Sequence, residues 1–338
     1  MNIRFTSVFF VLAFLISCQE NNTSRLDTNA GEQTASSPLD SINSLIKESP
    51  NAHELYFERA KLHYGSKDLA SSLSDVGRAL KLDSGRAEYY ILLADLKLIS
   101  KESRASRDAL LKAHKISPDN ADVLIKLGEL YMIVRDADAS FTYLNKALKL
   151  DVYNAKAYRL KGFNYKYLGD TANAVSSFQT AVEQDASDYD SYLQLGFIYA
   201  SIEHEIAEDY FKNALSVRPE SIEALYALGL HYQTTGRPRE AIEAYHQITD
   251  LNEAYWNAYY NIGWVYLELI HAYDSSAQFF TKAIQYGPQN YYEAVYNRGL
   301  CYERQSKLAE AEQEYRSALK MNPQYDAAAH GLSRVLGE

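Results

Sequence analysis

The sequence predicts an all-α fold, a solenoid of about eight helix pairs with capping helices at both ends. Three observations lead to this prediction: a repeat length near 34 residues from His53 onward, helical spacing of apolar residues in every repeat, and small residues at fixed repeat positions. Stacked repeats of this size bury their core only between neighbours, so the array behaves as one domain. The expected repeats are 53–86, 87–120, 121–154, 155–188, 189–221, 222–255, 256–291 and 292–325.

Two repeat positions keep a fixed residue size, one always small and the other always large. The eighth position is always Gly or Ala: Ala60, Ala94, Gly128, Gly162, Gly196, Gly229, Gly263 and Gly299. The twenty-fourth is always large and apolar: Val76, Leu110, Leu144, Phe178, Phe211, Tyr245, Phe280 and Tyr315. Where two helices cross closely, a minimal side chain lets the backbones approach, and a large one fills the remaining space. The pattern therefore predicts tight pairing of the two helices in each repeat.

Tyrosine recurs at the eleventh position in six successive repeats, and proline recurs near the thirty-second, as Pro118, Pro219, Pro288 and Pro323. With the small positions, this pattern resembles the tetratricopeptide-repeat (TPR) family from His53 to the end of the chain. The resemblance implies a right-handed superhelical solenoid whose first helices line a concave groove, with positions 2, 5, 9, 12 and 13 pointing into it.

Segments outside the regular repeats are expected to cap or adjust the stack. Apolar spacing between Leu39 and Ile46 predicts a lone helix before the first repeat, and residues 326–338 predict a final capping helix. The fifth repeat lacks one residue, and the seventh gains one near Tyr273 and another near Tyr291. We expect these length changes to fall in loops between helices, where they are tolerated.

The N-terminus carries an export signal. Residues 1–17 combine Arg4 with an apolar run too short to span a bilayer, as in a signal peptide. The following Leu15-Ile16-Ser17-Cys18 resembles a bacterial lipobox, which implies that Cys18 is lipidated; the alternative is an ordinary signal peptide with a chance cysteine. Residues 18–38 are expected to form a flexible tether. The resemblance to lipoproteins implies a location in the bacterial cell envelope, and by their common sorting rule the absence of Asp at Gln19 implies the outer membrane rather than the inner one.

Composition and motifs exclude several function classes. A formal net charge of −10 does not suit nucleic acid, whose phosphates need a basic face. No motif of a metallopeptidase, nucleotide-binding loop or serine hydrolase occurs, so we expect neither an enzyme nor a cofactor or metal site. Cys301 is expected to pack between helices as a small apolar residue. Acidic residues at position 2 of many repeats suit the helix dipole better than a cation-binding stripe.

Large apolar residues mark a candidate groove. Position 9 is polar in the first three repeats but then becomes Phe163, Phe197, Leu230, Trp264 and Leu300, and position 5 adds Leu193, Tyr226, Tyr260 and Tyr296. We expect Phe197 and Trp264 to face solvent. A row of apolar side chains that is exposed in this way would need a partner to cover it. The alternative is that these side chains pack between neighbouring first helices. The Lys, Asn and Arg set of the family's two-carboxylate clamp is missing.

The expected function is a lipid-anchored scaffold or adaptor of the cell envelope. It would bind a partner protein or peptide in the concave groove of repeats 4 to 8 and attach to the membrane through its lipid. Two alternatives stay open: glycan or peptidoglycan binding through the tyrosine-rich groove, and a role as a pilotin or outer-membrane assembly factor.

Overall fold

The structure is a computed structural model that describes residues 37–337. These residues contain eighteen α-helices, one π-helical turn and no strand, so the predicted all-α class is confirmed. The lipobox, Cys18 and the signal peptide lie outside the described residues. The described chain divides into two units, one that ends at Pro50 and one that begins at Asn51. Helix α1 (Pro38–Glu48) belongs to the first unit and begins at Ser37, whose side chain accepts a hydrogen bond from the Asp40 amide.

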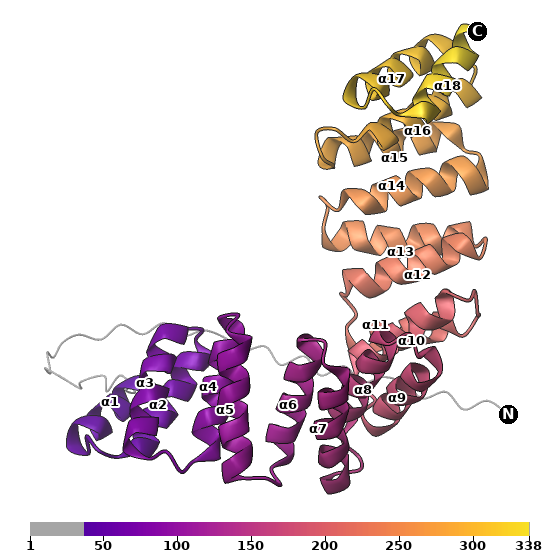
Figure 1. The fold of residues 1–338 in the computed structure, drawn as a ribbon. Helices are drawn as coiled ribbons and strands as arrows, with labels where there is room; N and C mark the ends of the chain where they lie inside the picture. The colour runs from indigo at the N-terminus through magenta and orange to yellow at the C-terminus, as the bar shows by residue number, and fades with distance from the viewer. Residues whose placement is uncertain (1–36, 338) are drawn as a thin grey trace, which may run out of the picture. The chain divides into compact units, whose positions relative to one another are not determined.

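The second unit contains eight helix pairs, as the repeat length predicted (Figure 1). The first helices of the pairs are α2 (His53–Gly65), α4 (Ala87–Ile99), α6 (Ala121–Ile133), α8 (Ala155–Tyr167), α10 (Tyr189–Ala200), α12 (Ile222–Thr234), α14 (Trp256–Val265) and α16 (Tyr292–Arg304). The second helices are α3 (Leu69–Leu82), α5 (Ser103–Ile116), α7 (Ala137–Leu150), α9 (Thr171–Gln184), α11 (Ala207–Val217), α13 (Pro238–Leu251), α15 (Tyr273–Tyr286) and α17 (Leu308–Met321).

The turn between the two helices of each pair contains one residue with a left-handed backbone. These eight residues are Lys67, Lys101, Arg135, Gly169, Glu203, Gly236, His271 and Ser306, with φ between 54° and 78°. A residue in this conformation ends a helix by redirecting the chain, and glycine adopts the left-handed conformation most easily. Most turns here use other residues, so repeat packing rather than glycine fixes their conformation.

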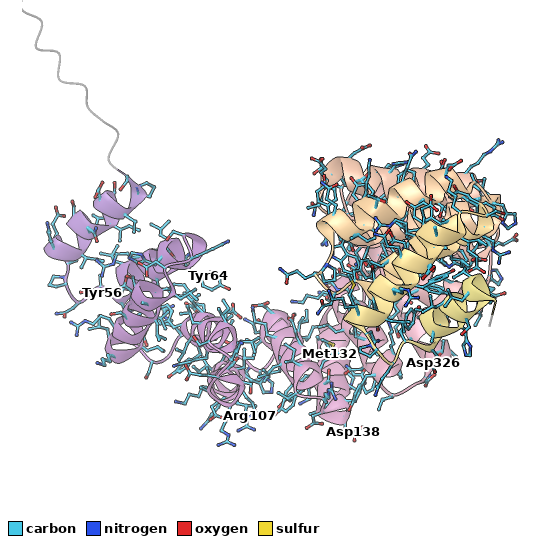
Figure 2. The ribbon with its side chains drawn as sticks, turned by 90° about the horizontal axis from the view of Figure 1, so that it is seen from above. Tyr56, Tyr64, Arg107, Met132, Asp138 and Asp326 are labelled. Carbon is cyan, nitrogen blue, oxygen red and sulfur yellow. The ribbon has the colours of Figure 1, made fainter. Side chains whose placement is uncertain are left out.

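The core lies between the paired helices. The residues at repeat position 24 are almost fully buried, including Phe178, Phe211 and Tyr245. Neighbouring first helices also touch one another, as α6 touches α8 and α10 touches α12. The two helix sets therefore form opposite sides of the stack. In Figure 2, Met132 of α6 and Asp138 of α7 lie on these opposite sides.

The C-terminal cap is confirmed, and one length change is placed differently from the prediction. Helix α18 (Asp326–Leu336) packs on α17 and α16, and a Cβ atom at its Gly331 would lie only 2.8 Å from the Tyr315 ring. The expected extra residue near Tyr273 is not in a loop: it is taken up by the π-helical turn Tyr266–Ile270 at the end of α14. A π-turn absorbs one residue without breaking the helix.

No helix between residues 37 and 337 has the length and apolar character needed to cross a membrane.

Candidate functional site: the first-helix face of repeats 4 to 8

The first-helix face is the surface formed by positions 2, 5, 6 and 9 of helices α8 to α16. The nine side chains that the sequence proposed for a groove all belong to these helices, and eight of them reach the surface. Leu230 on α12 is the most accessible, with 42% of its surface exposed. Seven of the others are partly buried: Phe163, Phe197, Tyr226, Tyr260, Trp264, Tyr296 and Leu300.

Leu193 does not belong to the accessible face. Only 3% of its surface is exposed, and it is part of the core formed with Phe211 and Leu225. It occupies the position at which repeats 6 to 8 carry tyrosine, whose longer side chain reaches further from the helix. The expectation that Leu193 lines the groove is therefore wrong.

The aromatic residues at position 9 do not stand free in solvent, in contrast to the expectation for Phe197 and Trp264. The Phe197 ring meets the Phe211 ring edge-on at 5.6 Å, and Phe163 meets Phe178 in the same way at 5.2 Å. Trp264 packs against the clusters on both sides of α14. Each side chain thus contributes one face to the core and leaves the rest accessible, so these residues have both a structural and a surface role.

Tyrosines form a regular ladder across repeats 6 to 8. In each repeat the tyrosine at position 5 touches two other rings: the ring at position 24 of its own repeat and the tyrosine just before the next first helix. The ring pairs across repeats are Tyr226–Tyr255 at 6.3 Å, Tyr260–Tyr291 at 5.4 Å and Tyr296–Tyr325 at 5.3 Å. We call these six residues the tyrosine ladder. Asn297 on α16 ties two repeats together by donating a hydrogen bond of 2.9 Å to the Tyr260 hydroxyl.

Three tyrosines of the ladder stand where other repeats have a helix-capping residue. The sequence prediction of the groove did not include these three tyrosines. In the middle of the chain the residue before each first helix is Asn120, Asn154, Asp188 or Ser221, and its side chain accepts a hydrogen bond from the helix. Before α14, α16 and α18 that residue is Tyr255, Tyr291 or Tyr325, without a side-chain cap. Losing such a cap costs about 1 kcal/mol. The residue just before each first helix carries the signal: it changes from Asn, Asp or Ser in the middle repeats to Tyr near the C-terminus.

Negative charge is concentrated in the same part of the chain. Residues 189–325 contain 18 Asp and Glu against 10 Lys and Arg, whereas residues 37–188 contain 21 of each. The Glu293 carboxylate at the start of α16 lies close enough to the tyrosine ladder to affect it. Burial raises the pKa of Tyr325 to about 12, and Glu293 adds to the rise. Burial likewise raises the pKa of Tyr260, again with a contribution from Glu293.

A metal site and a reactive thiol each make definite demands on the ionisable groups elsewhere in the described chain. No group of three or more His, Cys, Asp or Glu side chains within residues 37–337 is placed to hold a metal ion. Cys301 is fully buried, as predicted, and burial raises its thiol pKa to about 11. Its thiol donates to Ser276 Oγ at 3.1 Å, which donates to the Gly263 carbonyl at 2.7 Å. This thiol links two repeats and is not an activated nucleophile.

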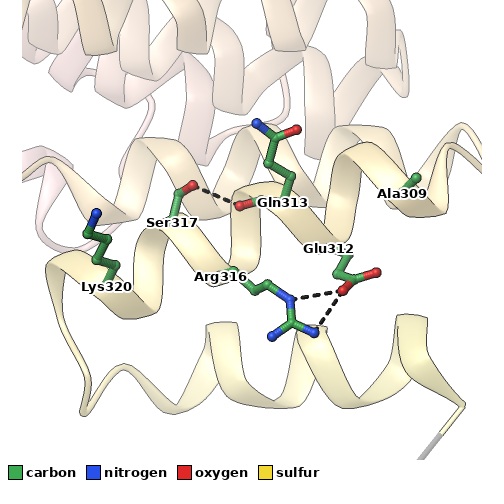
Figure 3. Close-up of a pocket in the computed structure, with 6 residues that line it drawn as sticks. All are labelled: Ala309, Glu312, Gln313, Arg316, Ser317 and Lys320. Atoms are coloured by element: carbon green, nitrogen blue, oxygen red, sulfur yellow. Dashed lines mark hydrogen bonds and ion pairs between the residues drawn. The ribbon is translucent and has the colours of Figure 1, made fainter.

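A separate surface hollow lies on α17 and is lined by six residues of that helix alone: Ala309, Glu312, Gln313, Arg316, Ser317 and Lys320 (Figure 3). Arg316 and Glu312 pair across it with Nη2 and Oε1 2.8 Å apart. Because a single helix supplies every wall, the hollow is open surface and does not bring groups from different elements together.

The comparisons with known proteins agree with the repeat pattern. A tetratricopeptide repeat family model matches residues 226–291 and 273–326, and a second matches residues 121–151 and 155–188. No curated protein matches the chain in sequence.

Several solved structures resemble the fold. The C-terminal part of a TPR repeat-containing protein from Cytophaga hutchinsonii aligns with a TM-score of 0.62 at 15% identity, covering 71% of this chain and 98% of that one. MamA aligns at 26% identity with a TM-score of 0.43, and the alignment covers 49% of this chain and 92% of MamA. YrrB, described as a TPR protein with an unusual peptide-binding site, aligns at 24% identity with a TM-score of 0.44, covering 56% and 98%.

Proposed function

Because the chain belongs to the tetratricopeptide-repeat family, we propose that it is a lipid-anchored scaffold of the bacterial cell envelope that holds a partner protein or peptide on the first-helix face of repeats 4 to 8. Proteins of this family commonly bind protein partners. What carries the proposal here is the accessible apolar surface of that face. Leu230 is 42% exposed between repeats whose Phe197 and Trp264 are only partly covered.

The physical argument is the cost of leaving this surface in water. Half-buried Phe, Tyr, Trp and Leu side chains follow one another over successive repeats on one side of the stack, whereas position 9 of repeats 1 to 3 is Lys61, Asp95 and Glu129. Contiguous apolar surface of this kind marks interaction sites in soluble proteins. Aromatic residues in particular dominate the binding energy of interfaces.

Membrane attachment is the second part of the proposal and rests on the Leu15-Ile16-Ser17-Cys18 sequence. A lipid on Cys18 would leave 19 residues before the first residue of α1 at Pro38. Whatever its conformation, a chain of that length spans at most about 65 Å. The repeats would thus be held near the bilayer, where they could collect an envelope partner.

Glycan binding is the weaker alternative. A sugar ring needs a whole free ring face to stack on, but each position-5 tyrosine packs against two other rings and leaves only part of its surface accessible. The rings at the start of α14 and α16, Tyr255 and Tyr291, are likewise packed.

Photo-crosslinking in the native host tests the proposal. A photoreactive residue at Leu230 samples the first-helix face, and one at Leu251 on α13 is a matched control, because it lies in the same repeat with 43% of its surface exposed. We expect a discrete protein crosslink from position 230 and none from position 251. Crosslinks only from position 251 would place the partner on the second helices and contradict the proposal.

A further inference from the structure

We propose that the segment bound by repeats 6 to 8 is basic, with Lys or Arg side chains seated on the tyrosine ladder between Glu223 and Glu293. This inference rests on the proposed function, because it names the kind of partner that the first-helix face takes. Four observations on the described residues lead to it.

The first is the charge of the surrounding repeats. The excess of eight carboxylates lies entirely within residues 189–325 among the structured repeats, since residues 37–188 are balanced. Repeats with this surplus raise the local concentration of cations and repel acidic segments. Acidic peptides and nucleic acid are therefore poor occupants.

The second is the state of two carboxylates on the first helices that carry the ladder. Glu223 and Glu293 each occupy position 2 of a first helix, at the start of α12 and α16. Neither forms an ion pair with a basic side chain in the part of the chain that the structure describes, although Glu303 further along α16 is paired with Arg334, with Oε1 and Nε 2.9 Å apart. The two carboxylates thus remain available to an incoming cation.

The third is the chemistry of the surface between them. Tyrosine rings attract ammonium and guanidinium groups through the negative potential of the ring face. The chain already uses this contact elsewhere, because the Arg218 guanidinium lies 4.1 Å from the centroid of the Tyr189 ring. Partly exposed Tyr226, Tyr260 and Tyr296 offer the same chemistry in three consecutive repeats.

The fourth is an amide donor without a partner. Asn261 on α14 holds the same repeat position as Asn297, whose amide donates to the Tyr260 hydroxyl. Asn261 is 92% buried, since its exposed fraction is 8%. Its amide nitrogen lies near the buried Tyr245 hydroxyl but has no partner in hydrogen-bonding geometry among the described residues. A buried donor left unpaired costs about 1–3 kcal/mol, and an acceptor on a bound chain would relieve this cost once the Asn261 side chain turns toward the surface.

Both tryptophans of the chain, Trp256 and Trp264, lie on α14 in the middle of the ladder. Their intrinsic fluorescence therefore reports on occupancy of the face without a label. The full-length protein is titrated at low salt with a short peptide in which lysine alternates with alanine. Two matched peptides carry glutamine or glutamate in place of lysine.

We expect the lysine peptide to change the fluorescence and to bind at least tenfold more tightly than the glutamine peptide, and we expect the glutamate peptide not to bind. Raising the salt concentration should weaken lysine-peptide binding, because exposed charges are screened. Glu223→Gln and Glu293→Gln should each weaken it by about two- to fivefold. Glu310→Gln is the control: Glu310 also lies in the first turn of a helix, but on α17, and its loss should leave binding unchanged.

Equal binding of the lysine and glutamine peptides would overturn the inference, as would equal effects of Glu293→Gln and Glu310→Gln. These results leave the crosslink from position 230 untouched, so the partner class can fail while the proposed function stands. If position 230 captures no protein, the proposed function fails by itself, whatever the peptides do.

Discussion

Gly196 on α10 and Phe211 on α11 are fitted to each other. A Cβ atom at Gly196 would lie 2.5 Å from Cδ1 and from Cε1 of Phe211, closer than carbon atoms approach without displacement. The equivalent pair in the second repeat is Ala94 and Leu110, both buried. In both pairs the residue at position 8 is small enough to leave room for the side chain at position 24.

This match predicts energetic coupling between the two positions. Gly196→Ala should lower the free energy of unfolding by about 1–3 kcal/mol, because the added methyl group overpacks the Phe211 ring. Phe211→Leu should lower it as well by leaving a cavity. The double variant recreates the pair of the second repeat. Its loss of unfolding free energy should be smaller than the sum of the two single losses, by a coupling energy of at least about 0.5 kcal/mol.

Denaturant unfolding of the natural protein, the two single variants and the double variant measures this coupling. Strictly additive losses would show that the two side chains do not interact. Gly77→Ala on α3 is the control, since no atom lies within 4 Å of a Cβ there. That change should be neutral or stabilise by up to about 1 kcal/mol.

A charged cluster between repeats 5 and 6 predicts acid sensitivity. Burial alone would raise the pKa of Glu208, but hydrogen bonds from Lys212, Arg237 and Tyr232 outweigh it and lower the value to about 2. The donor-to-oxygen distances are 2.7, 2.5 and 3.0 Å. Because the folded-state pKa is depressed, this contribution to stability is present above pH 4.5, the ordinary value, and is lost as the pH falls toward 2.

Glu208→Gln should therefore lower the free energy of unfolding at pH 7 by about 1–3 kcal/mol. The difference between the variant and the natural protein should shrink steadily between pH 4.5 and pH 2, the two pKa values of the group. Urea denaturation at several pH values measures it. A difference that is the same at pH 7 and at pH 2 would mean that the ionised carboxylate contributes nothing.

The packing of Trp264 predicts a structural cost for its replacement. Since Trp264 contacts the clusters on both sides of α14, Trp264→Glu should destabilise the fold by about 2 kcal/mol or more. Leu230→Glu should cost less than about 0.5 kcal/mol, because that side chain is exposed. Thermal melts of the two variants compare these costs directly, and an unchanged melt for Trp264→Glu would show that its contacts are not needed.

The lipobox predicts that Cys18 is the acceptor of the lipid. Cys18→Ala should yield a protein without lipid that stays uncleaved or is released from membranes, because alanine has no thiol for the diacylglycerol. Labelling with a radioactive fatty acid and fractionation of the cells check this. A Cys18→Ala variant that is still labelled and still fractionates with membranes would exclude the assignment.

The sequence was sufficient to predict most of the fold, because the matched sizes at positions 8 and 24 recur in every repeat and set how the helices pair. The π-turn at Tyr266–Ile270 was not predictable in this way. An inserted residue can be absorbed within a helix as well as in a loop, and local spacing does not distinguish the two.

The candidate site was predictable only in outline. Position in the repeat was enough to assign these side chains to the first helices but not to give the depth of each one. Leu193 is covered because it is shorter than the tyrosines at equivalent positions and lies against Phe211 and Leu225. Phe197 is half-covered by the Phe211 ring of the paired helix. Such depth depends on contacts between helices, which one sequence read along its length does not contain.

Binding of a partner through the first helices of repeats 4 to 8 can be tested with one pair of variants, Leu230→Glu and Leu251→Glu. The two leucines share a repeat and have 42% and 43% of their surfaces exposed. The measurement is the amount of the crosslinked partner that each variant captures. We expect Leu230→Glu to melt as the natural protein does but to capture about fivefold less partner, and Leu251→Glu to capture it normally. Normal capture by Leu230→Glu, or an equal loss in both variants, would show that the first helices do not bind the partner.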